Sequence, residues 1–202
     1  MSEGTISAIL LAAGESRRMG SQRIRRTPKP LLAWQGATLI EYQIAQLREA
    51  GVGDVIAVLG HRSQDVLPLV TAAGARGIVN ETYREGRASS LRAGAAAAEG
   101  TQTVVVLSVD QPRPAAVTRR LLADHTSGIT VPSFDGRRGH PVVLDGALLP
   151  ELREVSEATQ GLRAVIARHA TEVREVPFDS AAVLLDLNTP EDYHRATARD
   201  NP

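Results

Sequence analysis

Short apolar runs rich in β-branched residues alternate along the chain with longer segments of helical periodicity. The apolar runs are too uniformly hydrophobic for a sheet that has one face in water. They predict strands at residues 5–11, 54–59, 75–79, 103–109 and 129–132. The segments between them place apolar residues three and four positions apart, and they predict helices at residues 38–50, 63–73, 88–99 and 114–125. Three of these helices are followed by a glycine that can end them, namely Gly51, Gly74 and Gly100.

Buried strands separated by helices predict an α/β fold with three layers, in which helices cover both faces of a doubly wound, mostly parallel sheet. The alternation changes after residue 132, where a polar Asp-Gly turn within residues 133–138 leads into an apolar run at 141–144. This pattern predicts a hairpin inserted near residues 133–145 and therefore a mixed sheet. A strand around residues 182–187 and helices at about 159–169 and 190–199 complete the expected elements. A length of 202 residues with 43% hydrophobic content predicts a single domain, residues 1–202.

Composition narrows the classes of function. Twenty-three basic residues balance 23 acidic residues, so no overall charge favours nucleic acid or an anionic membrane. The chain has no cysteine, which excludes disulfides, thiolate metal sites and cysteine nucleophiles and fits a reducing cytoplasm. The apolar stretch 6–13 is too short to span a bilayer, and the acidic Glu3 precedes it where an export signal would be basic. We expect a soluble cytoplasmic protein that binds neither nucleic acid nor membrane.

The first predicted strand ends in a loop of small residues and arginines. Its sequence is Leu11-Ala12-Ala13-Gly14-Glu15-Ser16-Arg17-Arg18-Met19-Gly20. The loop has neither the Gly-Lys-Ser/Thr ending of a P-loop nor the glycine spacing of a dinucleotide-binding fold. Its backbone N–H groups and guanidinium groups suit a polyphosphate, although a solvated loop with surface arginines also explains them.

Other polar residues sit where predicted strands end or helices begin. Asp110 follows the apolar run 104–109, so its carboxylate should emerge beside the first loop, where ligands bind in such sheets. Mg²⁺ takes one or two carboxylates together with substrate phosphates, which fits Asp110, and a turn or helix-capping role is the alternative. Ser89 and Ser90 begin a helix after Gly86, where they either reach a nucleotide base or ribose or simply cap the helix.

Two other kinds of catalytic site find little support. The five histidines include no pair at metal-ligand spacing, which argues against a zinc site. Ser16, Ser89 and Ser108 have no histidine nearby in the sequence that would suggest a hydrolytic triad.

Several segments, in order between residues 6 and 195, resemble the nucleotidyltransferases that include the molybdenum-cofactor cytidylyltransferases and guanylyltransferases. The first loop resembles the opening signature of this family. The further matches are a lysine segment at residues 29–36, a base-side loop at 80–94, a metal-binding strand end at 109–112, an acceptor-side turn at 138–141 and a closing motif at 187–192. Ala13, the Asp-Gln-Pro at 110–112 and the Gly-His-Pro at 139–141 are more similar to the cytidylyltransferase branch.

The resemblance implies a Rossmann-like nucleotidyltransferase fold, a site for Mg²⁺ and roles for particular residues. The implied catalytic residues are Arg18, Lys29 and Asp110. The implied nucleotide-binding residues are Leu11, Ala12, Ala13, Gly14, Ser16, Arg17, Arg18, Lys29, Gly60, Asn80, Ser89, Ser90 and Asp110. The implied acceptor-binding residues are Gln111, Pro112, Gly139, His140 and Pro141, with His140 alternatively satisfying a loop carbonyl. The implied metal ligands are Asp110 and Asn188, and Asp186 is the competing candidate for the second position.

One segment departs from the family pattern. The family lysine usually stands three residues after the position of Gly20, where this chain has Arg23. Lys29 keeps the downstream context of that lysine, so residues 21–27 look like a basic insertion that also carries Arg25 and Arg26. The insertion leaves open which cation meets the triphosphate.

The resemblance implies transfer of CMP from CTP to a phosphorylated acceptor, most simply molybdopterin, with release of pyrophosphate. Such an acceptor needs no strong general base, because a phosphate monoester is largely ionised at neutral pH. The alternatives are a guanylyltransferase, a sugar-phosphate nucleotidyltransferase, and a nucleotide-binding chaperone without turnover that passes a cofactor to a partner enzyme.

Overall fold

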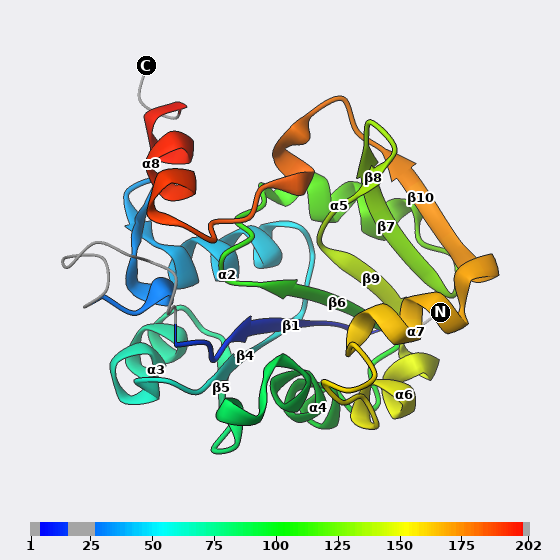
Figure 1. Ribbon diagram of the computed structural model, residues 1–202, viewed down its shortest axis with the longest axis horizontal. Coiled ribbons are helices and arrows are strands. Elements are labelled where there is room, and N and C mark those ends of the chain that lie inside the picture. Colours follow the sequence, from blue (N-terminus) through cyan, green and yellow to red (C-terminus); the bar gives the residue numbers. More distant parts are fainter. Residues whose placement is uncertain (1–4, 16–26, 200–202) are drawn as a thin grey trace.

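A computed structural model describes residues 5–15 and 27–199 of the chain. Its centre is an eight-stranded sheet in the order β10-β7-β9-β6-β1-β4-β5, with β8 paired to β7 (Figure 1). The strands are β1 (Ile6–Ala12), β4 (Asp54–Leu59), β5 (Arg76–Val79), β6 (Thr103–Ser108), β7 (Ile129–Phe134), β8 (Arg137–Arg138), β9 (Val142–Asp145) and β10 (Val173–Pro177). β9 runs antiparallel to both β6 and β7, whereas β1 is parallel to β4 and β6. The predicted α/β fold with a mostly parallel, mixed sheet is confirmed.

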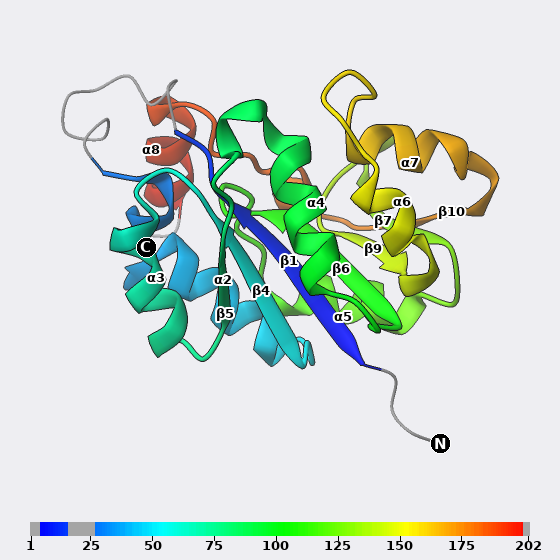
Figure 2. The same ribbon diagram turned by 90° about the horizontal axis from the view of Figure 1, so that it is seen from below.

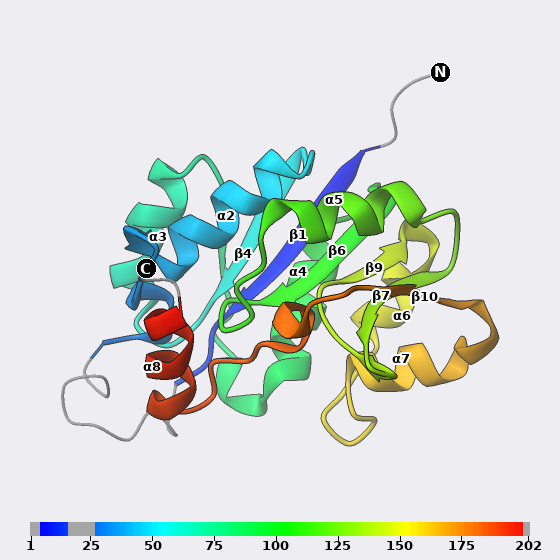
Figure 3. The same cartoon turned by 90° about the horizontal axis from the view of Figure 1, so that it is seen from above.

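Helices cover both faces of this sheet. α4 (Arg87–Ala97), α6 (Leu149–Arg153) and α7 (Leu162–Arg168) lie on one face (Figure 2). α2 (Leu39–Glu49), α3 (Ser63–Ala72) and α5 (Ala115–Asp124) lie on the other (Figure 3). α8 (Pro190–Arg199) packs beside a small hairpin of β2 (Ala33–Trp34) and β3 (Ala37–Thr38), where the Tyr193 hydroxyl donates to the Ala33 carbonyl at 2.6 Å. No helix in the described ranges is both long and apolar enough to cross a membrane.

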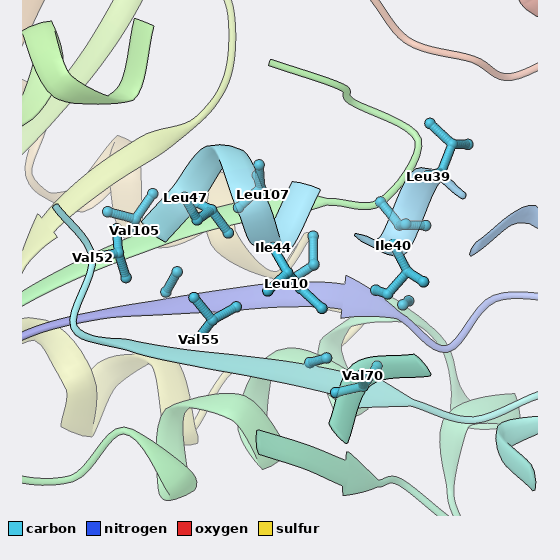
Figure 4. Packing of buried hydrophobic residues seen from close by; sticks show 14 of the residues in the cluster. Leu10, Leu39, Ile40, Ile44, Leu47, Val52, Val55, Val70, Val105 and Leu107 are labelled. Carbon is cyan, nitrogen blue, oxygen red and sulfur yellow. The ribbon is translucent and has the colours of Figure 1, made fainter. Parts of the chain in front are cut away.

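Burial on both faces explains why the central strands β1, β4 and β6 are mostly apolar. Leu10 of β1 packs in one buried cluster and Ile9 in the other, and both are fully buried. Figure 4 shows Ile44 and Leu47 of α2 lying over Leu10 and Val55 of the sheet. A strand that is covered on both faces has no solvent-facing side, so the alternation of a half-exposed strand is missing.

Local signals place the helices near their predicted ends. Thr38 caps α2 in a reciprocal arrangement, in which its backbone N–H donates to the Glu41 carboxylate at 3.0 Å. Gly51 and Gly74 follow α2 and α3 with φ angles of 99° and 73°, a left-handed conformation that glycine adopts without a steric penalty.

The strand predicted around residues 182–187 is wrong. Residues Ala181–Leu184 form a 3-10 helix, and no strand follows before α8. The carbonyls of Val183 and Leu185 accept hydrogen bonds from the buried Arg113 side chain instead of from a neighbouring strand. The sequence pattern also missed β10, because only Val176 of its five residues is buried and an edge strand of this kind has little hydrophobic periodicity.

Residues 133–145 divide between a hairpin and the main sheet. β7 and β8 pair antiparallel across a turn at Asp135 and Gly136, both of which have positive φ angles. The next strand, β9, does not extend that hairpin. It lies between β6 and β7 in the main sheet and so links the parallel part of the sheet to its far edge.

Candidate active site

An open cavity of about 500 Å³ lies at the carboxyl ends of β1 and β6. This is the edge of a doubly wound sheet where ligands ordinarily bind. Its lining residues are Leu11, Ala12, Ala13, Gly14, Glu15, Lys29, Pro30, Tyr83, Arg84, Gly86, Arg87, Ser90, Ser108, Val109, Asp110 and Asn188. Several residues singled out in the sequence therefore meet in one place, although they are spread from position 11 to position 188.

Lys29 and Asp110 form an ion pair in this cavity. The Lys29 Nζ lies 2.9 Å from the Asp110 Oδ2, and the two side chains are only 12% and 23% exposed. Lys29 opens a short 3-10 helix (Lys29–Leu31), whereas Asp110 follows β6 in the turn that leaves the sheet. Partial burial strengthens such a pair compared with one in open solvent, and it leaves both groups within reach of a ligand.

Asn188 lines the cavity beside Asp110. The Leu187 backbone N–H donates to the Asp110 carbonyl at 2.8 Å, which fixes the closing segment against the end of β6. The competing residue Asp186 is placed differently, because it does not line the cavity and its Oδ1 is buried without a hydrogen-bond partner in the described ranges. Of the two candidates for a second metal ligand, the geometry favours Asn188.

The donor set suits a hard divalent cation. Asp110 offers a carboxylate oxygen and Asn188 an amide oxygen, which match the preference of Mg²⁺ for oxygen ligands. No group of three or more acidic, histidine or cysteine residues that could hold a metal occurs within residues 5–15 and 27–199. This is compatible with Mg²⁺, which usually takes one or two carboxylates together with substrate phosphates.

Backbone hydrogen bonds hold the described part of the first loop against the segments that follow β4 and β6. The Ala13 carbonyl accepts from the His61 N–H at 3.1 Å, and the Leu11 carbonyl accepts from the Val109 N–H at 3.0 Å. Gly60 does not line the cavity but supports it, because a Cβ at this position would lie 2.6 Å from the Tyr83 ring and 2.8 Å from the Ala13 carbonyl. The predicted site residues Ser16, Arg17 and Arg18 lie outside the described residues.

Asn80, Ser89 and Ser90 form one hydrogen-bonded group at the start of α4. The Asn80 Nδ2 donates to the Ser89 Oγ at 2.9 Å and to the Ser90 Oγ at 3.0 Å. All three side chains are buried, and only Ser90 lines the cavity. Asn80 and Ser89 therefore shape the loop at residues 80–90, whereas Ser90 can also meet a ligand.

Gln111 and Pro112 are buried and do not line the cavity. Gln111 is 3% exposed, and its Oε1 accepts from the Ser108 N–H at 3.0 Å. The buried Gln43 of α2 donates to the carbonyls of Ser108 and Gln111 at 3.2 and 2.7 Å, so a polar side chain of a helix fixes the turn that carries Asp110. The sequence reasoning missed Gln43, because a glutamine on a helix is most often exposed.

Arg113 links the turn at residues 139–141 to the segment that precedes α8. Its side chain is fully buried, and its guanidinium donates to the carbonyls of His140, Leu185 and Val183 at 2.9, 2.8 and 2.9 Å. Burial lowers the pKa of Arg113 to about 10, against the opposing effect of Asp186 and Asp110. An arginine between two prolines gave no sequence signal of such a role.

His140 lies in a Gly-His-Pro turn with a cis bond to Pro141, and none of the three residues lines the cavity. Burial lowers the pKa of His140 to about 4, and the charges of Arg87, Arg113 and Arg163 act in the same direction while Asp110 opposes them. Its Nδ1 is buried and has no hydrogen-bond partner among the described residues. His140 is therefore a neutral imidazole at physiological pH.

Comparison with known proteins agrees with the fold. A protein from Mycobacterium tuberculosis H37Rv, Rv0371c, has a solved structure that superposes with a TM-score of 0.81 at 29% identity, covering 96% of this chain and 98% of that one. A nucleotidyl transferase from a Methanothermobacter species shares the fold with a TM-score of 0.83 at 24% identity, over 96% and 97% of the two chains. Both solved structures thus share the α/β fold of this chain.

The chain belongs to the family defined by the MobA-like NTP transferase domain, whose model matches residues 8–173. Two characterised relatives are similar along nearly their whole length. The nicotine blue oxidoreductase of Paenarthrobacter nicotinovorans is 32% identical over 94% of this chain and 95% of its own. The molybdenum cofactor cytidylyltransferase of Escherichia coli K12 is 24% identical over 96% of each chain.

Proposed function

We propose that this protein is a Mg²⁺-dependent cytidylyltransferase, which transfers CMP from CTP to a phosphorylated acceptor of the molybdopterin type and releases pyrophosphate. The observation that carries this proposal is the Lys29–Asp110 pair beside Asn188, in a cavity at the carboxyl ends of β1 and β6. The family membership and the E. coli cytidylyltransferase support the class of reaction and the choice of donor. The absence of cysteine supports a cytoplasmic location.

The reaction is an in-line displacement. An oxygen of the acceptor phosphate attacks the α-phosphorus of CTP, the bond from that phosphorus to the bridging oxygen breaks, and pyrophosphate leaves with the electron pair. Such chemistry depends mainly on positioning and on the stabilisation of charge. No side chain has to remove a proton, because the acceptor phosphate is largely ionised at neutral pH.

Different residues of the cavity would contact the triphosphate, the metal ion and the rest of the nucleotide. Lys29 is placed to exchange its carboxylate partner for an oxygen of the triphosphate and to neutralise the leaving pyrophosphate. Asp110 and Asn188 would hold Mg²⁺, which when bound supplies further positive charge to the phosphates. The backbone of residues 11–14, together with Ser90, lies where it can contact the nucleotide. We further propose that the turn at residues 139–141 lies on the acceptor side of the site, although its residues do not line the cavity.

A panel of nucleotides tests this proposal. Purified protein is mixed with Mg²⁺, a phosphorylated pterin acceptor and CTP, GTP, UTP or ATP, and pyrophosphate release is measured. We expect CTP to be preferred at least tenfold.

Asp110→Asn should lower turnover by roughly a hundredfold or more, because the carboxylate is lost at the reacting phosphates. The control Asp65→Asn, at a half-buried carboxylate of α3 that pairs with Arg62 and does not line the cavity, should leave turnover unchanged.

The other outcomes identify the rivals. A preference for GTP would indicate a guanylyltransferase, and turnover only with a sugar phosphate would indicate a sugar-phosphate nucleotidyltransferase. Tight CTP binding without pyrophosphate release from any acceptor would indicate a chaperone that delivers a cofactor.

A second candidate function is an oxidoreductase, which the 32% identity to a nicotine blue oxidoreductase favours. It is tested by following the visible absorbance of nicotine blue in the presence of NADH or NADPH. Loss of colour that requires the protein, together with no pyrophosphate release in the nucleotide panel, would replace the transferase proposal. We favour the transferase, because the cavity places a lysine, a carboxylate and an amide together at one sheet edge, a set suited to phosphates.

A further inference from the structure

Arg87 differs from the other cationic side chains that line the described part of the cavity. Lys29 is paired with Asp110 at 2.9 Å, and Arg84 is paired with Glu15 at 3.3 Å. The Arg87 guanidinium instead donates to the neutral hydroxyl of Ser108 at 2.6 Å. Within the described residues, Arg87 is thus a cation of the cavity whose charge no carboxylate of the chain offsets through an ion pair.

The start of α4 directs this side chain toward the sheet. Arg87 is the first residue of α4, which packs along β1 and β4 (Figure 2). The next N–H of the helix, that of Ala88, already donates to the Glu157 carboxylate at 2.5 Å. The Ala88 N–H is therefore not available to an incoming anion. The cationic donor that remains for an anion is the Arg87 guanidinium, which is hydrogen-bonded to Ser108.

The position of Ser108 places this guanidinium between two sides of the site. Ser108 ends β6, two residues before Asp110, and β6 pairs with β1 on one side and with β9 on the other. β1 leads into the nucleotide-side loop, whereas β9 follows the turn at His140. The charge of Arg87 also reaches that turn, since it contributes to the lowered pKa of His140.

We propose that Arg87 forms a phosphate subsite for the acceptor, over the end of β6 and between the nucleotide and the His140 turn. This inference rests on the proposed function and names the residue that recognises the acceptor's anionic group. A guanidinium is permanently charged and can donate two parallel N–H bonds to phosphate oxygens, which fixes the orientation of the phosphate. Such a group is needed here, because a doubly charged acceptor phosphate must approach an anionic triphosphate closely enough to react.

The test measures phosphate binding separately from turnover. Inorganic phosphate is titrated in a thermal-shift assay into protein saturated with CTP and Mg²⁺, and CTP is titrated in a second series. We expect Arg87→Gln to raise the Kd for phosphate at least tenfold and to change the Kd for CTP by less than twofold. Arg87→Lys, which keeps the charge but loses the paired donors, should raise the phosphate Kd about threefold. Arg84→Gln is the matched control, because Arg84 lines the same cavity but is already paired and 77% exposed, and it should leave the phosphate Kd unchanged.

The outcomes separate this inference from the proposed function. A loss of CTP affinity in Arg87→Gln, or an unchanged phosphate Kd, would overturn the subsite. Failure of the wild-type protein to bind CTP would instead count against the proposed cytidylyltransferase function. In that case, the phosphate Kd values of the nucleotide-free wild type and Arg87→Gln would still show whether Arg87 binds phosphate. If Arg87→Gln does not fold, Ser108→Ala removes the hydroxyl that holds the guanidinium and should raise the phosphate Kd about threefold, and no change in that variant would contradict the proposal.

Discussion

Lys29 and Asp110 are 81 positions apart in the sequence and 2.9 Å apart in space. Each has a local explanation when it is considered alone, a surface lysine before a proline and a turn aspartate after a strand. Their contact supports the proposed site, because two partly buried opposite charges at the open end of a sheet are costly to desolvate unless they serve one another or a ligand. At the residue scale, function therefore depends on pairs of residues.

Lys29→Ala should weaken binding of CTP at least tenfold, which is about 1.4 kcal/mol, because it removes the cation that is paired with Asp110 in the cavity. Isothermal titration at two salt concentrations measures the change, and the wild-type affinity should fall more steeply with salt. Arg25→Ala is the comparison, since Arg25 belongs to the basic insertion outside the described residues. Equal losses in the two variants would show that Lys29 is not the principal cation.

His140 should make the protein less stable in mild acid. Its pKa is about 4 in the folded chain and close to 6.5 when unfolded, so between these values the unfolded state binds a proton that the folded state does not. The free energy of unfolding should then fall by roughly 3 kcal/mol as the pH drops from 6.5 to 4, and this contribution is constant above that window.

Urea unfolding between pH 4 and 8 measures this dependence, with His140→Gln as the variant that should lose most of it. His194→Gln, at an exposed histidine of α8, is the control and should retain the wild-type pH dependence. Identical curves for His140→Gln and the wild type would show that other groups cause the acid sensitivity.

Single elements of this fold are joined by buried polar side chains as well as by apolar packing. Gln43 of α2 bonds the turn after β6, and Arg113 bonds both the His140 turn and the segment before α8. These contacts help to explain why residues 182–187 are not a strand, since the carbonyls of Val183 and Leu185 accept from a guanidinium. A pattern of apolar residues does not reveal such a competitor, because it comes from 70 positions away.

Arg113→Met should destabilise the protein by roughly 3 kcal/mol, because it removes the guanidinium donor from the buried carbonyls of His140, Val183 and Leu185. Of these carbonyls, that of Val183 keeps the backbone N–H of His140 as a donor. The melting temperature should fall by about 6–12 °C for a chain of this size. The control Arg119→Met, on the exposed face of α5, should cost less than about 1 kcal/mol. A similar cost for both variants would mean that the buried guanidinium does not hold these segments together.

The whole molecule is stabilised by two apolar clusters on opposite faces of one sheet. Leu10 belongs to the cluster under α2, α3 and α5, and Ile9 belongs to the cluster under α4, α6 and α7. The carboxyl ends of β1 and β6, where the cavity lies, are thereby packed from both faces of the sheet. This packing keeps the loops that follow these two strands at fixed positions.

Leu10→Ala should lower the free energy of unfolding by about 3 kcal/mol, through lost burial and the cavity that remains. Val79→Ala, at a side chain that is 40% exposed, should cost less than about 1 kcal/mol. Denaturant titration measures both. Equal costs would contradict the assignment of Leu10 to a tightly packed core.

The amino-acid sequence by itself determined the α/β class and the positions of most strands and helices, because continuous apolar runs, helical spacing and terminal glycines are local properties. It also indicated Lys29, Asp110 and Asn188, since the matching segments stand in the order of a known family. Only the tertiary structure decided which polar residues share a cavity, that Asn188 rather than Asp186 lines it, and that Arg113 is buried while Arg87 is directed to Ser108. These facts depend on contacts between segments far apart in the chain, and the pattern along the sequence carries no record of which carbonyl or hydroxyl a long side chain will reach.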